Sequence, residues 1–151
     1  MFESIAAQSG VVNQMIGDGL MALFSTAQEL PETALAAAQT GLNMIEMIEL
    51  LNTKRIAASK GPIAIGIGIA SGEMIAGHTG TQDRATYTCI GDTVNLAARL
   101  KAHTKIAKRA ILVDQETNKA LAGRLLTDAL GPEKFKGKAE AVDVFALGVT
   151  S

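Results

Sequence analysis

Alternation of large and small apolar residues marks the segment 63–70. Isoleucine stands at positions 63, 65, 67 and 69, and alanine or glycine stands at each position between and after them. A period of two predicts a strand, here with one branched aliphatic face and one nearly bare face. A bare face lets another backbone approach closely. We expect one of the chain's own helices to pack there, and a partner subunit is the alternative.

Helical spacing replaces this alternation in the segment 25–54. Its apolar positions recur every three or four residues, and Pro31 lies where the first helical turn is expected. Gln39 and Glu46 fall on the opposite, polar face. The pattern predicts a long amphipathic helix whose apolar stripe comprises Leu35, Ala38, Leu42, Ile45, Ile48 and Leu51.

Two short apolar runs flank the sequence Gly17-Asp18-Gly19 near the start of the chain. We predict the end of a helix over 2–8, a strand over 11–16, a turn, and a second strand over 20–24. Asp-Gly supplies the positive φ angles that a tight hairpin turn needs. A carboxylate on a sharp turn at a strand end is also placed to hold a metal ion. The local sequence leaves both interpretations of Asp18 open.

Shorter patterned segments follow the long helix. Asp92 is expected to cap a helix over 92–105, and a short helix is expected over 117–125. The polar segment 77–84 predicts a loop. Strands are predicted over 73–76, 85–90, 109–117, 125–131, 133–138 and 141–148. This order predicts an α+β fold with a largely antiparallel sheet covered by helices, in a single domain spanning residues 1–151.

Composition narrows the class of protein. With 151 residues, 48% of them hydrophobic, and no Trp, the chain can build one core, which must be aliphatic. The net charge of -1 provides no field that would attract nucleic acid. The single Cys89 excludes an internal disulfide and suits a reducing, cytoplasmic compartment. No run reaches the ~18 apolar residues of a membrane span, and the first ten residues do not resemble a signal peptide. We expect a soluble domain without membrane contact.

The candidate chemistry centres on Asn95 and Arg99. Side chains four residues apart share one face of a helix, so an amide and a guanidinium project together near a helix start. An amide can hold a ribose oxygen, and a guanidinium can fork onto phosphate oxygens. Taken alone, an ordinary solvated surface explains both residues better. Lys136, in a Phe-Lys-Gly-Lys turn, is likewise either a surface charge or a phosphate clamp.

Four stretches together resemble a known family. The sequences VVNQMIGDGLMALF, IGIGIASGEMIAGHTG, TYTCIGDTVNLAARL and FKGKAEAVDVFAL occur in the order found in class III nucleotide cyclase catalytic domains. The resemblance runs from about Gly10 to Leu147, and GDTVNLAARL is its most specific part. It implies a ferredoxin-like α+β sheet flanked by helices, and the synthesis of cyclic AMP or cyclic GMP.

The resemblance also implies roles for individual residues. Asp18 matches the second of the family's two metal-binding aspartates, which would hold Mg²⁺ or Mn²⁺, two ions in a complete site. Asn95 matches the residue that orients the ribose, Arg99 the one that stabilises the phosphate as charge develops, and Lys136 the one that contacts the terminal phosphates. The reaction would be in-line attack of the ribose 3′-oxygen on the α-phosphorus, with pyrophosphate leaving.

In this family the site forms between two catalytic domains in head-to-tail pairing. Asp18 of one chain would therefore act with Asn95, Arg99 and Lys136 of a second copy, and the partners implied are ATP or GTP and a homodimer. Regulatory domains commonly accompany such catalytic domains.

Two departures from the family pattern change the expectation. Nothing before Val11 matches the usual Phe-x-Asp-Ile strand, which carries the other metal aspartate, so the first strand is expected to be missing. We interpret the chain as a piece of a longer enzyme, with a natural remnant as the alternative, and expect little or no activity from it.

Gln14 and Thr88 occupy the positions that read the base. Thr88 fits one adenylate subclass and Gln14 fits neither usual pattern, so ATP is favoured over GTP only by Thr88.

Other functions remain open at this stage. A pseudo-cyclase acting as a dimerisation or nucleotide-sensing module is the main alternative. A different phosphoryl-transfer enzyme on a similar sheet is a third, although the Asn95 and Arg99 pair disfavours it and no P-loop pattern exists. His78 and His103 are expected to be surface residues without a catalytic role.

Overall fold

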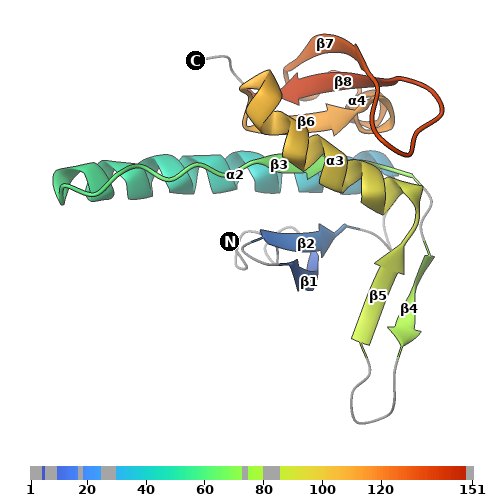
Figure 1. Ribbon diagram of the computed structural model, residues 1–151, viewed down its shortest axis with the longest axis horizontal. Coiled ribbons are helices and arrows are strands. Elements are labelled where there is room, and N and C mark those ends of the chain that lie inside the picture. The colour runs from blue at the N-terminus through green and yellow to red at the C-terminus, as the bar shows by residue number, and fades with distance from the viewer. Residues whose placement is uncertain are drawn as a thin grey trace.

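A computed structural model describes residues 5, 10–16, 19–24, 30–72, 75–79 and 86–148 of the chain. Its longest element is a helix, and the hairpins and a larger sheet lie toward the N-terminal end of that helix (Figure 1). The elements are β1 (Val11–Ile16), β2 (Gly19–Leu23), α2 (Leu30–Ala57), β3 (Ile67–Ile69), β4 (Ile75–Thr79), β5 (Thr86–Ile90), α3 (Asp92–Ala107), β6 (Ile111–Asp114), α4 (Gln115–Leu121), β7 (Thr127–Glu133) and β8 (Val142–Leu147).

The largest sheet among the described residues has the strand order β3-β6-β8-β7. β3 runs parallel to β6, with Ile67 opposite Ile111, and the other two pairings are antiparallel. β1 with β2, and β4 with β5, form two further antiparallel pairs. The predicted α+β class with a mostly antiparallel sheet and flanking helices is confirmed.

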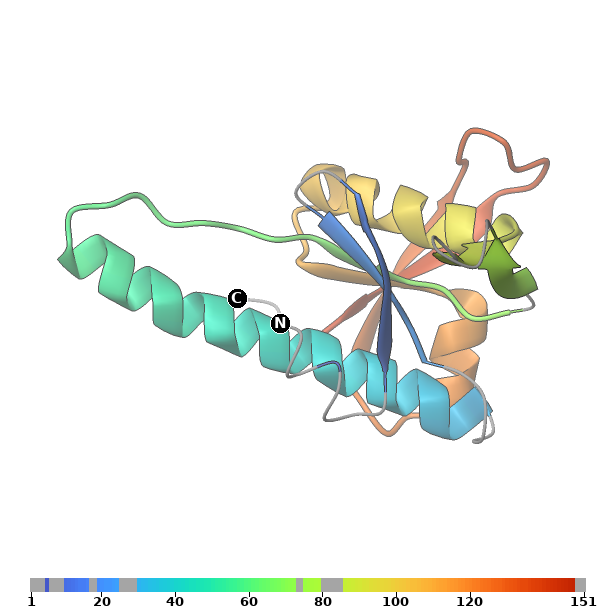
Figure 2. The ribbon, with the colours of Figure 1, turned by 90° about the horizontal axis from the view of Figure 1, so that it is seen from below.

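Helices cover both faces of the four-stranded sheet (Figure 2). The side chains of β6 divide between these faces because successive residues of a strand point to opposite sides. Ile111 and Val113 belong to a buried cluster with α2 and α4. Leu112 belongs to a second cluster with Leu96 and Leu100 of α3. The described elements therefore form a three-layer arrangement, with α3 on one face of the sheet and α2 and α4 on the other.

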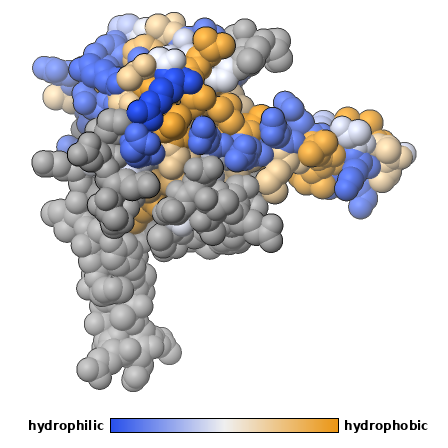
Figure 3. All heavy atoms as spheres, turned by 180° about the vertical axis from the view of Figure 1, so that it is seen from behind, coloured by the Kyte–Doolittle hydropathy of each residue, from blue (hydrophilic) through white to orange (hydrophobic). Residues whose placement is uncertain are grey.

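The amphipathic prediction for α2 holds for only part of the helix. Ala38 is fully buried, and Leu35, Leu42 and Ile45 pack on the cluster formed with the sheet. Farther along, α2 projects past the body of the molecule (Figure 2). Leu51, predicted to lie in the buried stripe, is 42% exposed, because the sheet does not extend beneath this half of the helix. Apolar residues therefore lie on the surface of the projecting half (Figure 3).

The strand predicted over 63–70 is shorter than its pattern. Only β3 pairs, because its partner β6 begins at Ile111, opposite Ile67. Residue 63 is instead held by a side chain of α2. The amide nitrogen of Asn52 donates to the carbonyl of Ile63 at 2.8 Å, and its amide oxygen accepts from the nitrogen of Ile63 at 2.7 Å.

The predicted hairpin forms, and the strands predicted on either side of the loop 77–84 also pair, with different limits. Ile16 pairs with Gly19, so β1 and β2 are joined as expected, with an irregularity between Val12 and Gln14. β4 continues to Thr79, where a loop was predicted from residue 77 onwards; that part of the loop prediction is wrong. The extension forms because β4 pairs with β5 as far as Thr79 opposite Thr86.

Several boundaries predicted in the C-terminal half are wrong, including those of the strand predicted over 125–131, which is β7 (Thr127–Glu133). The strand predicted over 109–117 ends at Asp114, because the carboxylate of Asp114 accepts a hydrogen bond from the nitrogen of Thr117 and caps α4. The short helix therefore begins and ends earlier than predicted, and Ala122 ends it with φ 51°. The strand predicted over 133–138 is a turn after its first residue.

No helix in the described part of the chain is long and apolar enough to cross a membrane.

Candidate functional site

Helix α3 presents Asn95 and Arg99 to solvent. Its opposite side buries Leu96 and Leu100 in the core. Asn95 and Arg99 are exposed, and their separation of four residues places them on one face. The helix begins after Gly91, whose φ is 145°, so the prediction that Asp92 is the cap is wrong. Asp92 is the first helical residue, and Gly91 at the cap position has no side chain to cap the helix.

Glycines of the segment before and within β3 determine how closely α3 approaches the sheet. A Cβ atom added to Gly68 would lie 2.5 Å from the backbone nitrogen of Lys101 and closer still to the carbonyl oxygen of Ala97. One added to Gly66 would lie 3.2 Å from the carbonyl oxygen of Lys101. The prediction that the chain's own helix packs on the bare face is confirmed. These glycines therefore set the distance between the sheet and the helix that carries Asn95 and Arg99.

Lys136 lies at the tip of a tight turn. The backbone nitrogen of Lys138 donates to the carbonyl of Phe135 at 3.1 Å, and Gly137 has φ 89°, a conformation that glycine adopts without strain. Lys136 is exposed, whereas Phe135 is buried in the cluster that contains Leu96 and Leu100. The turn that carries Lys136 is therefore anchored on the same helix as Asn95 and Arg99.

Gln14 and Thr88, the predicted base-reading residues, lie on neighbouring strands. Gln14 is paired with Met21 in the β1–β2 hairpin, and Thr88 is paired with Gly77 in β5. β1 and β5 contact one another, and β5 leads through residue 91 directly into α3. Asp18 lies outside the described residues, between the paired ends of β1 and β2. The roles of Asp18, Gln14 and Thr88 stay predictions.

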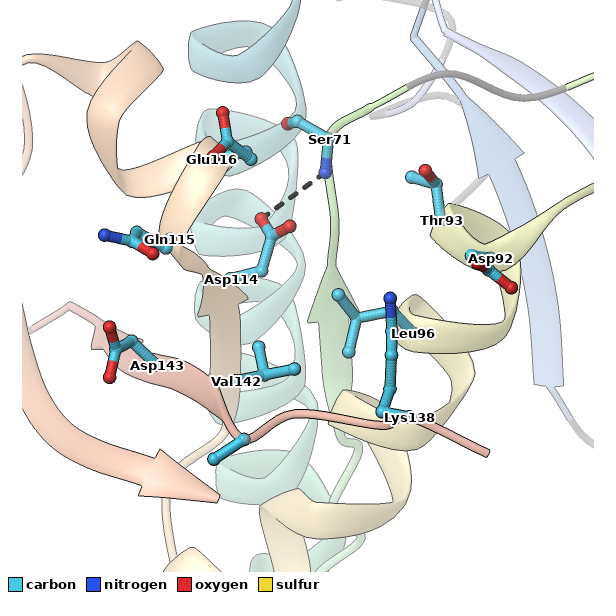
Figure 4. A pocket seen from close by; sticks show the side chains of 11 residues that line it. Ser71, Asp92, Thr93, Leu96, Asp114, Gln115, Glu116, Lys138, Val142 and Asp143 are labelled. Atoms are coloured by element: carbon cyan, nitrogen blue, oxygen red, sulfur yellow. Dashed lines mark hydrogen bonds between the residues drawn. The ribbon is translucent and has the colours of Figure 1, made fainter. Parts of the chain in front are cut away.

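A cavity of about 260 Å³ opens beside the start of α3 (Figure 4). It lies between the end of β3, the start of α3, the β6–α4 junction and the start of β8. Its charged lining consists of Asp92, Asp114, Glu116 and Asp143 against Lys138. A cavity with this excess of carboxylates repels a triphosphate. None of the predicted nucleotide contacts Asn95, Arg99 and Lys136 lines this cavity.

Asp114 is the buried carboxylate of this cavity, and the sequence analysis missed it. One of its oxygens accepts from the nitrogen of Thr117 at 2.9 Å. The same oxygen accepts from the nitrogen of Ser71 at 3.4 Å, the bond drawn in Figure 4. Burial raises the pKa of Asp114, and the hydrogen bonds from Thr117 and Ser71 partly oppose that shift. The hydroxyls of Ser71 and Thr117 are 2.7 Å apart. An aspartate directly before a helix-forming run was the available signal of a cap.

The described residues do not form a metal centre of their own. No group of three or more His, Cys, Asp or Glu side chains within them could hold a metal ion. The acidic cavity therefore does not fit Mg²⁺ or Mn²⁺, which require several oxygen ligands. The predicted metal site depends on Asp18, outside those residues.

The family model of the adenylate and guanylate cyclase catalytic domain matches residues 1–148. The chain belongs to this family. The crystal structure of the adenylyl cyclase CyaB from P. aeruginosa superposes with a TM-score of 0.87 at 27% identity, covering 99% of this chain and 76% of that one. The crystal structure of the guanylyl cyclase Cya2 gives a TM-score of 0.84 at 25% identity, covering 96% of this chain and 73% of that one.

Two of the sequence relatives of the cyclase domain are named adenylate cyclases. The terminal-differentiation specific adenylate cyclase of Dictyostelium discoideum is 30% identical over 150 residues, which are 95% of this chain and 7% of the relative. Adenylate cyclase 1 of Rhizobium meliloti is 28% identical over 145 residues, which are 96% of this chain and 22% of the relative. The chain thus spans a small part of the length of these relatives.

Proposed function

We propose that this cyclase domain, as part of a longer enzyme, converts a purine nucleoside triphosphate, ATP in preference to GTP, to the 3′,5′-cyclic nucleotide and pyrophosphate. One observation carries the proposal. Asn95 and Arg99 share the exposed face of α3, and Lys136 stands on a turn packed against that helix, in a chain whose family match covers residues 1–148.

These three side chains can bind the ribose and the phosphates of a nucleotide. The amide of Asn95 orients the ribose by hydrogen bonding, which aligns the 3′-oxygen with the α-phosphorus. The guanidinium of Arg99 stabilises the charge that develops on the phosphate, an effect worth several kcal/mol at comparable sites. The ammonium of Lys136 binds the terminal phosphates as a point charge. Arg99 and Lys136 together offset part of the charge of the leaving pyrophosphate.

A second copy of the chain completes the site in this proposal. All three residues are exposed, so a triphosphate bound to them is open to solvent on its other side. Chemistry of this kind requires the exclusion of water and a divalent cation. In a head-to-tail homodimer, Asp18 would reach the nucleotide held by Asn95 and Arg99 of the other copy. This carboxylate would contribute to holding Mg²⁺ or Mn²⁺, two ions in the complete site.

The preference for ATP rests on the predicted pair Gln14 and Thr88. A Gln amide both donates and accepts hydrogen bonds, so it tolerates either purine, and Thr88 tips the choice toward ATP. We place the domain in the cytoplasm of the cell, under the control of regulatory domains in the same polypeptide.

Nucleotide binding tests the proposed phosphate contacts without requiring turnover. Calorimetric titration of the chain with ATP is expected to show about tenfold weaker binding for Arg99→Ala, because a charge-assisted contact to phosphate is lost. Lys105→Ala is the matched control. Lys105 is an exposed cation on the same helix, about 9 Å farther along its axis. Equal losses for the two variants would show that only general charge matters, and the proposed function would be wrong.

A further inference from the structure

A histidine without an assigned role continues the row formed by Asn95 and Arg99. His103 follows Arg99 by four residues on α3, as Arg99 follows Asn95, so all three lie along one side of the helix. Unlike the other two, His103 is largely buried, with 13% of its side chain exposed. The buried side chain contacts the end of β7 and the turn that follows it.

Two contacts join His103 to the segment that carries Lys136. Its ring meets the ring of Phe135 edge-on, with centroids 5.4 Å apart and planes at 85°. This is a favoured geometry for aromatic pairs. Its Nε2 atom lies 3.9 Å from a carboxylate oxygen of Glu133. That separation is too long for a hydrogen bond, and the Glu133 side chain is 43% exposed, so the ring contact is the stronger of the two.

The turn after β7 fixes the backbone of Lys136 relative to Phe135. The hydrogen bond from the nitrogen of Lys138 to the carbonyl of Phe135 closes the turn around Lys136. The positive φ of Gly137 is part of the same turn. The backbone of Lys136 is thus held relative to the Phe135 ring, which contacts His103 and belongs to the core cluster of Leu96 and Leu100.

We infer that His103 is a positioning residue, which sets the place of Lys136 relative to Arg99 through the Phe135 ring. The inference rests on the proposed function, in which both cations bind the same triphosphate. A lysine side chain is long and flexible, so its backbone must be fixed if it is to favour one phosphate position. Without the ring contact, the turn is less well anchored on α3. Binding of the terminal phosphates then weakens, while binding of the ribose and the α-phosphate is unchanged.

The experiment compares the affinities of the chain for ATP and for AMP. Lys136→Ala is expected to lower ATP affinity about tenfold and to leave AMP affinity unchanged. His103→Leu keeps apolar bulk but loses the ring. It is expected to lower ATP affinity about threefold to tenfold, again without an effect on AMP. His103→Phe restores the edge-on contact without a titratable group and is expected to restore ATP affinity. Glu133→Gln is expected to leave both affinities unchanged.

The outcomes separate the two proposals. If Lys136→Ala leaves the ratio of ATP to AMP affinity unchanged, the proposed phosphate contact is wrong, and the inference falls with it. If Lys136→Ala lowers the ratio and His103→Leu does not, the proposed function stands and the role of His103 is overturned. A His103→Leu variant that binds ATP and AMP equally less well, with a lower melting temperature, would show a purely structural residue. Failure of His103→Phe to restore affinity would also contradict a role for the ring.

Discussion

Gly68→Ala is expected to displace α3 and with it the candidate nucleotide contacts. The added Cβ would lie 2.5 Å from the nitrogen of Lys101 and 2.9 Å from the Cβ of Leu100. Ordinary contacts between such atoms are about 3.5 Å, so the helix and the strand must separate by about 1 Å. The neighbouring atoms belong mostly to the backbone of α3, so no side-chain rotation relieves the overlap.

The magnitude follows from this displacement. Overpacking of this kind costs about 1–3 kcal/mol, and we expect the upper half of that range because backbone must move. A shift of about 1 Å in a group that positions substrate costs up to 100-fold in rate at other sites. ATP affinity is expected to fall, since Asn95 and Arg99 move with α3 away from the sheet.

Urea denaturation and ATP titration measure the two effects, and Gly61→Ala is the control. A Cβ at Gly61 would have nothing within 4 Å, so that substitution is expected to be neutral, or stabilising by less than about 1 kcal/mol. If Gly68→Ala were as stable as Gly61→Ala and bound ATP as the wild type does, direct packing of α3 on β3 would be refuted.

Two further predictions concern the buried carboxylate and turnover. Because burial raises the pKa of Asp114 above 3.8, its contribution to the free energy of unfolding is fully present below pH 3.8 and declines as the pH rises through the higher folded-state pKa. Asp114→Asn keeps a capping residue but does not titrate. Urea denaturation at a series of pH values should show the stability of the wild type falling relative to this variant with rising pH, and a parallel dependence would contradict the assignment. The purified chain with Mn²⁺ and ATP is expected to form little or no cyclic AMP, because Asp18 is its one matched metal carboxylate; robust product formation would show that expectation wrong.

Local sequence was enough to predict many elements and part of the site. The hairpin of β1 and β2 and the helix α2 both follow from short-range patterns. So does the shared face of Asn95 and Arg99, because helical spacing alone places residues four apart together. The prediction that a helix packs on the bare face of β3 is also confirmed, because glycine at alternate positions lets the helix backbone approach closely.

Tertiary structure decided where those patterns stop. The alternation that begins at Ile63 becomes a strand only at Ile67, because the parallel partner starts at Ile111. Leu51 has the spacing of a buried residue, yet it is exposed because α2 extends beyond the end of the sheet. Period and turn chemistry are properties of neighbouring residues, whereas pairing and burial depend on segments far apart in the chain.

The candidate site divides in the same way. The sequence by itself determined which residue types are present and that Asn95 and Arg99 lie side by side. Only the fold brings the turn of Lys136 to α3, through the burial of Phe135 beside Leu96 and Leu100. More than 30 residues separate Lys136 from that helix face in the sequence, and no local pattern encodes a contact over such a distance. It arises because both segments bury apolar side chains against the same face of the sheet.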